Sequence, residues 1–202
     1  AQRILPLSAE ENGLHAEVLL RLMDNDGSLI APNAFLPAAE RFHFCSRIDK
    51  WVLQQVIDTL AALPDLTGIS TICVNLSGQS IGDRAFHRQA VDILSASGVS
   101  ICQRLCLEVT ETAAVTNMTD AALFIDEMRA LGVRIALDDF GSGASSFGYL
   151  KSLSVDLLKI DGQFVRDVME DPLDDAAVRC FVDVAGVVGV KTVAEFIDKP
   201  AV

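Results

Sequence analysis

The stretch Ile135-Ala136-Leu137-Asp138-Asp139-Phe140-Gly141-Ser142-Gly143 joins a short apolar run to two adjacent acids and a glycine-containing loop. Such runs are typical of buried strands in a parallel sheet. Five other segments also end a short apolar run with acids, an amide or a lysine: 17–21, 74–77, 107–111, 158–162 and 192–195. Because the carboxyl ends of parallel barrel strands meet at one mouth, the sequence predicts that these polar residues form one site.

Strand-like and helix-like stretches alternate along the whole chain, which is typical of repeated β-α units around a parallel sheet. Strands are predicted at 4–7, 16–22, 72–76, 101–109, 133–137, 155–160 and 191–194. Helices are predicted at 40–63, 86–97, 120–131, 145–150 and 175–188. Seven strands are one fewer than a closed barrel of this type contains. We therefore expect the last strand to lie beyond residue 202.

Length and composition fit one domain with a large core. The chain has 202 residues, of which 50% are hydrophobic, so disorder is not expected. No repeat or domain boundary interrupts the pattern. The sequence predicts a single barrel domain over residues 1–202, as a fragment of a longer multidomain protein.

Charge and cysteine content restrict the partners and the compartment. The formal net charge of −12 argues against non-specific binding to DNA or RNA, which needs a basic face. The five cysteines form no CxxC pair, so a reducing compartment is favoured over a disulfide scaffold. No apolar run reaches the length of a membrane span. We expect a cytoplasmic segment without membrane contact of its own, although a longer parent protein could be membrane-anchored.

Strand alternation places the polar residues of each segment on one face. Acids that face inwards at this density repel one another and lose hydration unless they are protonated, paired or bound to cations. Of these three possibilities, bound metal best explains how the acids can lie together. Oxygen ligands suit Mg²⁺ or Mn²⁺ rather than Zn²⁺ or copper. The candidate metal ligands are Glu17, Asn75, Glu108, Asp138, Asp139 and Glu195.

This ligand set suggests two-metal chemistry. Two cations about 3.5–4 Å apart can clamp a phosphodiester and activate a water as the nucleophile. Adjacent Asp138 and Asp139 could let one carboxylate bridge both ions while the other binds the second. Lys159 is predicted to orient the water or to balance charge.

Each of these residues also has an ordinary structural interpretation. An Asp-Asp pair alone is usually a turn or a helix cap, Lys159 alone a surface lysine, and Glu108 or Glu195 alone a salt-bridge partner. The segment Gly141-Ser142-Gly143 can be interpreted as a phosphate-cradling loop or, better, as a flexible loop that carries the second Asp. The joint placement of these residues on successive strand ends favours the metal site.

Together the segments resemble the EAL family of cyclic-di-GMP phosphodiesterases. Glu17-Val18-Leu19 stands where the family has Glu-Ala-Leu, and Leu20-Arg21 follows. Pro32, Phe35, Pro37, Ala39 and Glu40 also look like the family, as do Ile48-Asp49 and Trp51-Val52. The most specific stretches are 108–112, 137–143, 159–165 and 193–196.

The resemblance implies an α/β fold, a modified triosephosphate-isomerase-type barrel with one antiparallel strand. It implies hydrolysis of cyclic-di-GMP to linear pGpG with two Mg²⁺ or Mn²⁺ ions, with Ca²⁺ as an inhibitor. By motif position, Lys159 looks like the catalytic lysine, Glu111 like the glutamate that steadies the Asp-Asp-Phe-Gly loop, and Glu17 and Asp139 like metal ligands with catalytic roles. The positions that correspond to substrate binding are Arg21, as a phosphate contact, Leu19 and Asp161. A homodimer through the loop and helix after Asp139 is also implied.

Three departures from the family pattern stand out. Val18 replaces the usual Ala, Asp198 stands where a second Glu is common, and the strand that carries a Gln in the family would lie beyond Val202. The alternative function is a receptor module that holds cyclic-di-GMP without cutting it. Such relatives usually lack several ligands or the lysine, whereas all are present here, which favours catalysis. A scaffold that only dimerises would leave the acids unexplained.

Overall fold

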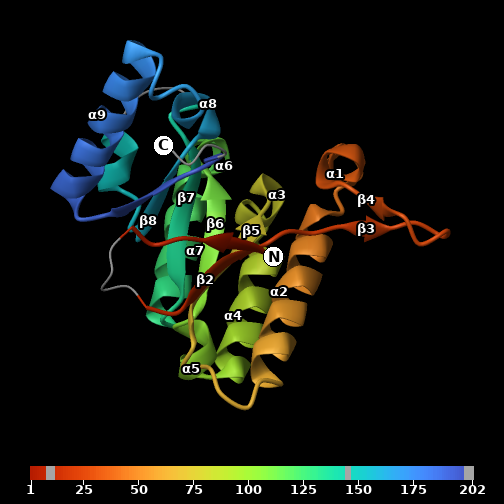
Figure 1. Cartoon of the computed structure of the whole chain (residues 1–202). Coiled ribbons are helices and arrows are strands. Elements are labelled where there is room, and N and C mark those ends of the chain that lie inside the picture. The colour runs from red at the N-terminus through yellow and green to blue at the C-terminus, as the bar shows by residue number, and fades with distance from the viewer. Residues whose placement is uncertain (8–11, 144–146, 198–202) are drawn as a thin grey trace.

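The computed structural model describes residues 1–7, 12–143 and 147–197. These residues form a curled seven-stranded sheet in the order β1-β2-β5-β6-β7-β8-β9 (Figure 1). The first strand is antiparallel to its neighbour and all the others run parallel. The predicted α/β barrel-type fold with one antiparallel strand is therefore confirmed. The strands are β1 (Gln2–Ile4), β2 (Leu14–Val18), β5 (Ile69–Leu76), β6 (Leu105–Thr110), β7 (Arg134–Phe140), β8 (Leu157–Ile160) and β9 (Lys191–Ala194).

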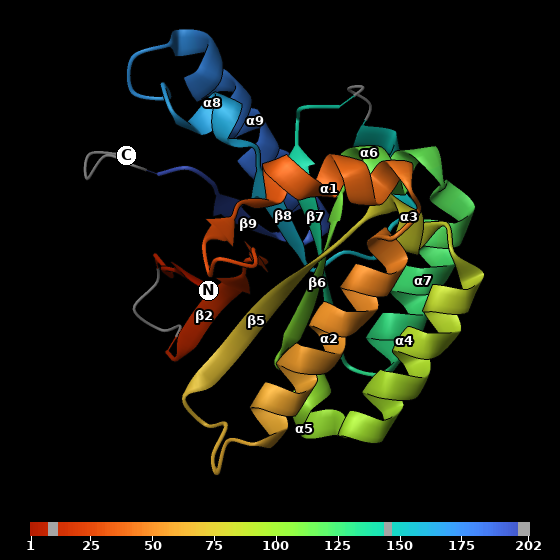
Figure 2. The ribbon, with the colours of Figure 1, turned by 90° about the vertical axis from the view of Figure 1, so that its right-hand side faces the viewer.

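Helices connect the strands and cover the outer face of the sheet. Figure 2 shows α2, α4 and α7 side by side along one part of the sheet, whereas α8 and α9 lie towards the β8–β9 edge. None of the described helices is long and apolar enough to cross a bilayer. The helices are α1 (Pro32–Arg41), α2 (Cys45–Ala61), α3 (Gly78–Ile81), α4 (Arg84–Ser97), α5 (Val99–Cys102), α6 (Glu111–Thr116), α7 (Met118–Ala130), the 3₁₀ helix η1 (Phe147–Lys151), α8 (Gly162–Val165) and α9 (Pro172–Val188).

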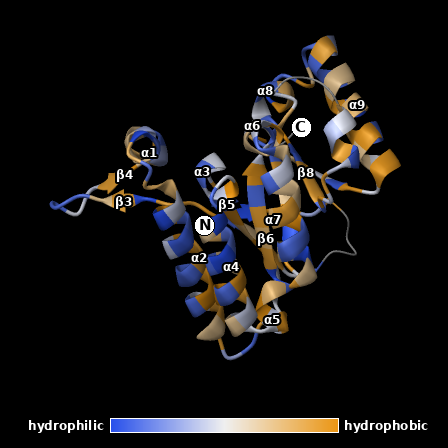
Figure 3. Cartoon of the chain, turned by 180° about the vertical axis from the view of Figure 1, so that it is seen from behind, coloured by the Kyte–Doolittle hydropathy of each residue, from blue (hydrophilic) through white to orange (hydrophobic). Residues whose placement is uncertain are grey.

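Side-chain alternation along the strands separates the apolar core from the polar interior. In β6, Leu107 and Val109 are buried in the main hydrophobic core, whereas Glu108 between them points to the other face. Figure 3 shows hydrophilic and hydrophobic residues alternating along α2 and α4, as expected of helices with one buried face. Below the polar residues, small side chains fill the barrel interior: Cys73, Cys106 and Ala136 form a second buried cluster.

The predicted strand 16–22 is wrong at its carboxyl end. Pairing of β2 with β5 ends at Val18, opposite Val74. Leu22–Met23 is instead β3, which pairs with β4 (Leu29–Ile30) in a two-stranded hairpin that stands out from the body of the protein (Figure 1). The turn joining β3 and β4 contains Gly27 with φ 85°, a conformation that suits glycine.

Other element boundaries also differ from the sequence prediction. The helix predicted at 40–63 is interrupted, because α1 ends at Arg41 and α2 begins at Cys45, with His43 between them at φ 57°. The strand predicted at 101–109 begins only at Leu105, since Val99–Cys102 forms the short helix α5. The first strand is 2–4 rather than 4–7. The helix predicted at 145–150 lies partly outside the described residues, and the described part belongs to the 3₁₀ helix Phe147–Lys151. Asp198 also lies outside the described residues.

Candidate active site

The strand register brings the predicted polar residues together at the carboxyl edge of the sheet. Asn75 of β5 lies opposite Glu108 of β6. Thr110 at the end of β6 lies opposite Asp138 of β7. Glu195 directly follows β9. The predicted convergence of strand ends is therefore what the parallel register produces.

The Lys159 ammonium lies at the centre of these strand ends. Its Nζ is 2.9 Å from Asp138 Oδ1 and 2.9 Å from Glu195 Oε1. It is 3.0 Å from Glu108 Oε2 and 3.5 Å from Glu17 Oε2. The lysine side chain is only 3% exposed, so it is not a surface lysine. One buried cation thus joins acids from four different strands or strand ends.

One ammonium does not balance the charge of four carboxylates. If all four acids are ionised, four negative charges against one positive charge leave −3. Burial alone would lower the pKa of Lys159, but Glu108 and the other acids together raise it above its ordinary value. Burial raises the pKa of Glu108 well above its ordinary value, and that of Glu195 to about 7. The site therefore favours the binding of further cations, either protons or metal.

One oxygen atom of the site has no hydrogen-bond partner among the described residues. This atom is Glu108 Oε1, which is buried. A buried carboxylate oxygen left unpaired is costly, and a hard cation with oxygen ligands would satisfy it. Oxygen atoms of Asp138, Asp139 and Glu195 also lie within 4.8 Å of one another, as a shared ion requires. The residues present therefore fit a divalent metal.

Asp138 and Asp139 reach one site although neighbouring strand residues normally point to opposite faces. The pairing of β7 with β8 is irregular between Leu137 and Phe140. Asp139 has φ 55°, an uncommon conformation for a non-glycine residue. Burial first, and then Asp138 and Asp161, raise the pKa of Asp139. The irregularity supplies the second acid, which alternation alone would turn away.

Asn75 and Glu17 are joined by a hydrogen bond across β2 and β5. Asn75 Nδ2 donates to Glu17 Oε1 at 2.7 Å. Glu17 Oε2 is the oxygen near Lys159. The carboxamide thus orients the Glu17 carboxylate within the cluster.

Glu111 holds the loop that follows Asp139, as the family resemblance implies. Its Oε2 accepts hydrogen bonds from the backbone N–H groups of Gly141 at 3.0 Å and Gly143 at 3.3 Å. The Tyr149 hydroxyl donates to Oε1 at 2.6 Å. A Cβ on Gly143 would lie 3.0 Å from the Glu111 carboxyl carbon, which favours glycine there. Tyr149 is not predictable from the sequence, because a single tyrosine in a short 3₁₀ helix carries no pattern.

The predicted substrate-binding residues are less tightly connected. Leu19 and Arg21 follow the end of β2, so the alternation used to place them on the Glu17 face does not apply. The exposed Arg21 donates from Nη1 to the Leu20 carbonyl oxygen at 2.7 Å. Asp161 caps α8 by accepting a hydrogen bond from Gln163 N at 2.8 Å.

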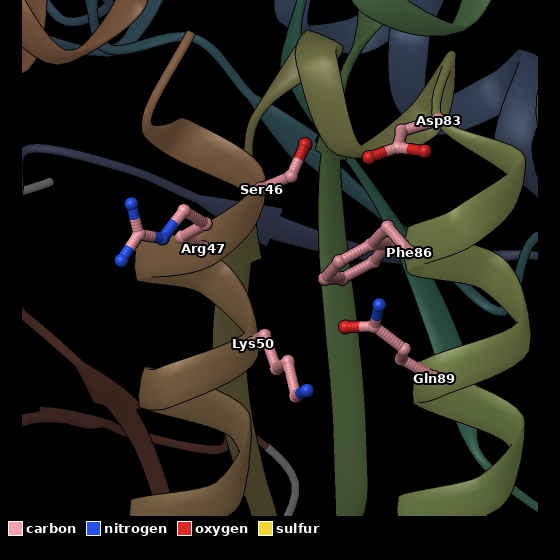
Figure 4. Close-up of a pocket in the computed structure, with 6 residues that line it drawn as sticks. All are labelled: Ser46, Arg47, Lys50, Asp83, Phe86 and Gln89. Atoms are coloured by element: carbon pink, nitrogen blue, oxygen red, sulfur yellow. The ribbon is translucent and has the colours of Figure 1, made fainter.

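A separate hollow of about 250 Å³ opens between α2 and α4 (Figure 4). It is lined by Ser46, Arg47, Lys50, Asp83, Phe86 and Gln89. None of these residues belongs to the carboxylate cluster, so this hollow in the outer helix layer is not part of the site.

A family model described as EAL domain matches residues 6–202. The chain belongs to the EAL domain family. It is 39% identical over 203 residues to the cyclic di-GMP phosphodiesterase PdeB of Shewanella oneidensis, with 98% of this chain and 23% of that protein covered. It is 33% identical over 193 residues to the cyclic di-GMP phosphodiesterase PdeF of Escherichia coli, with 96% of this chain and 26% of that protein covered. The EAL chain therefore spans about a quarter of the length of these curated relatives.

Solved structures agree with the family assignment. The PaMucR phosphodiesterase in complex with c-di-GMP has a TM-score of 0.86 and 31% identity to this EAL chain, covering 99% of it and 80% of the other chain. The FimX EAL domain from Pseudomonas aeruginosa bound to c-di-GMP has a TM-score of 0.87 at 24% identity, covering 99% of this chain and 79% of that one. At this lower identity, the similarity to the FimX domain shows a shared fold alone. The predicted family and modified barrel fold are both confirmed.

We expect Glu111→Gln to loosen the loop after Asp139. All three groups around the carboxylate are donors, so an amide NH₂ would face one of them. Amide exchange at Gly141 and Gly143 should accelerate about tenfold, because the hydrogen bonds that Glu111 accepts would lose roughly 1–2 kcal/mol of stabilisation. Hydrogen exchange followed by mass spectrometry measures this. The substitution Glu127→Gln, at an exposed residue of α7, is the control. Equal exchange rates in both variants would contradict the role of Glu111 in holding the loop.

We expect Mn²⁺ affinity to increase between about pH 6 and pH 8, because Glu195 must lose its proton to bind metal. Burial raises the pKa of Glu195 to about 7. In the metal-free protein the folded state holds the Glu195 proton more tightly than the unfolded state does. The resulting contribution to stability is complete below the pKa of the unfolded state and is lost as the pH rises through about 7. Calorimetry in buffers of different ionisation enthalpy counts the released protons. Glu195→Gln should reduce the dependence without abolishing it, since the pKa of Glu108 is also raised; an affinity of the parent that does not vary with pH would contradict this explanation.

Proposed function

We propose that this chain is a metal-dependent phosphodiesterase that hydrolyses cyclic-di-GMP to linear pGpG. The observation that carries the proposal is the assembled cluster in which Lys159 contacts Glu17, Glu108, Asp138 and Glu195. Relatives named as cyclic di-GMP phosphodiesterases support the substrate. The PaMucR phosphodiesterase, solved in complex with c-di-GMP, supports the same ligand.

The donor set favours two Mg²⁺ or Mn²⁺ ions. It consists of carboxylate and amide oxygens, and in the part of the chain that the structure describes, buried Glu108 Oε1 has no hydrogen-bond partner. Such ions supply Lewis acidity towards a phosphodiester and activate a water at neutral pH. The residues that would hold them are Glu17, Asn75, Glu108, Asp138, Asp139 and Glu195.

Lys159 acts in this proposal as a cation. In the metal-free structure the surrounding acids raise its pKa, and its ammonium contacts four carboxylates. The ammonium donates hydrogen bonds, orients the attacking water and balances the charge of the acids. Glu111 contributes indirectly, since it holds the loop that follows Asp139.

We assign Arg21, Leu19 and Asp161 to substrate binding. The Arg21 guanidinium is exposed beyond the end of β2, where a cation suits a phosphate oxygen. Asp161 follows Lys159 by two residues at the same edge of the sheet. In the sequence, Leu19 lies midway between Arg21 and the metal-ligand candidate Glu17. These three assignments come from motif position.

The alternative is a receptor that binds cyclic-di-GMP without cutting it. The presence of Lys159 and every candidate ligand favours catalysis over this alternative. A homodimer and a cytoplasmic location stay predictions of the sequence.

We expect the purified chain to hydrolyse cyclic-di-GMP with Mg²⁺ or Mn²⁺, and Ca²⁺ to support substrate binding without rapid turnover, because its looser coordination positions water poorly. Lys159→Ala should lower kcat at least about 100-fold and change KM less than about threefold, since its ammonium acts mainly in the transition state. The exposed Lys151→Ala is the matched control. Chromatography of the pGpG product gives the rate.

Two results would count against these assignments. Equal losses in substrate affinity and rate for Lys159→Ala would indicate a ground-state role. Tight binding of cyclic-di-GMP with no hydrolysis under any of the metals would favour the receptor.

A further inference from the structure

Asp49 is a buried acid that lies outside the carboxylate cluster. It belongs to α2, in the outer helix layer, and is 8% exposed. Cys45, Leu53 and Val56 share its buried helix face. Packing of this face against the sheet therefore fixes the position of the Asp49 side chain.

A single oxygen of Asp49 gathers three donors from the turn that follows β5. Oδ2 accepts hydrogen bonds from the Ser77 backbone N–H at 2.8 Å and from the Ser77 hydroxyl at 2.7 Å. The Ser80 hydroxyl donates to the same oxygen at 2.6 Å. Within the described residues Asp49 forms no ion pair. Burying a carboxylate is costly unless it is paired or hydrogen-bonded, so these three hydrogen bonds stabilise the buried Asp49 carboxylate.

The same turn begins two residues after Asn75. Asn75 Nδ2 donates to Glu17 Oε1 at 2.7 Å, and Glu17 Oε2 lies 3.5 Å from Lys159 Nζ. A continuous set of contacts thus runs from Asp49 through Ser77 and the end of β5 to Asn75 and Glu17. Groups that hold metal ligands in place commonly affect metal affinity although they do not touch the ion.

We propose that Asp49 is a positioning residue: from the outer helix α2 it fixes the carboxyl end of β5, so that the Asn75 carboxamide stays against Glu17 in the site. Asp49 does not touch substrate or metal. The inference rests on the proposed metal-dependent function, but its test uses Mn²⁺ alone and the metal-free protein, without cyclic-di-GMP. A chain that fails to hydrolyse the dinucleotide can therefore still confirm or overturn the role of Asp49.

The first arm of the experiment measures Mn²⁺ affinity by calorimetry in the 202-residue chain. Asp49→Ala should weaken binding about tenfold or more, the usual size for the loss of a group that supports a ligand. Asp49→Asn keeps an acceptor oxygen and should restore affinity to within about threefold of the parent. Leu53→Ala, one helical turn further on the same buried face, is the matched control. It should lower thermal stability but change Mn²⁺ affinity less than about twofold.

The second arm tests whether the effect travels through Asn75. In an Asn75→Ala background, Asp49→Ala should change Mn²⁺ affinity less than about twofold, since the group it positions is gone. Ser80→Ala removes one of the three donors without opening a large cavity, and should weaken Mn²⁺ binding two- to fivefold if the Asp49 variants fold poorly. In the metal-free protein, NMR should show faster exchange of the Asn75 side-chain amide in Asp49→Ala than in Leu53→Ala.

The proposal is overturned if Asp49→Ala and Leu53→Ala weaken Mn²⁺ binding equally at matched loss of stability. It is also overturned if Asp49→Ala costs the same factor with and without Asn75. If the parent binds no Mn²⁺, the proposed function fails, and the exchange of the Asn75 amide alone decides the role of Asp49: equal rates in the Asp49 and Leu53 variants reject it.

Discussion

The ion pairs of Lys159 are the interactions on which the mouth of the barrel depends. Four acids from different parts of the chain approach one buried ammonium within 3.5 Å. Buried charges are tolerated only when they are paired with good geometry. A single cation cannot satisfy all four acids, and no residue within 1–7, 12–143 or 147–197 donates a hydrogen bond to Glu108 Oε1. The fold therefore gathers more buried acids than one ammonium can balance, and these acids favour the binding of further cations, either protons or divalent metal.

The sheet fixes most of this cluster, and the surrounding helices complete it. Strand register sets the positions of Asn75, Glu108 and Asp138. The second acid, Asp139, depends on an irregular end of β7 and on the loop beyond it. Gly141, the first residue of that loop, is closely packed, because a Cβ there would lie 2.7 Å from the Phe181 ring of α9. Side chains outside the cluster thus restrict where its acids can lie.

The sequence predicted those parts of the structure that local patterns determine. Alternation and polar strand ends identified Glu108, Asp138 and Lys159, since parallel strands bring their carboxyl ends together whatever the loops do. The carboxyl end of β2 was predicted wrongly, because Leu19, Leu20 and Leu22 continue a strand pattern where the chain in fact leaves the sheet. The support from Tyr149 was not predictable in this way. Its contact with Glu111 joins residues 38 positions apart and leaves no local signal.

The most direct test of the metal site is anomalous diffraction from crystals of this chain grown with Mn²⁺. We expect two manganese peaks within coordination distance of the carboxylate oxygens of Glu17, Glu108 and Asp138, with Glu108 Oε1 now coordinated. The Lys159 ammonium should then contact fewer of the four acids than it does without metal. Manganese found only at surface acids, with the Lys159 contacts unchanged, would contradict the conclusion that these buried acids form a site for divalent ions.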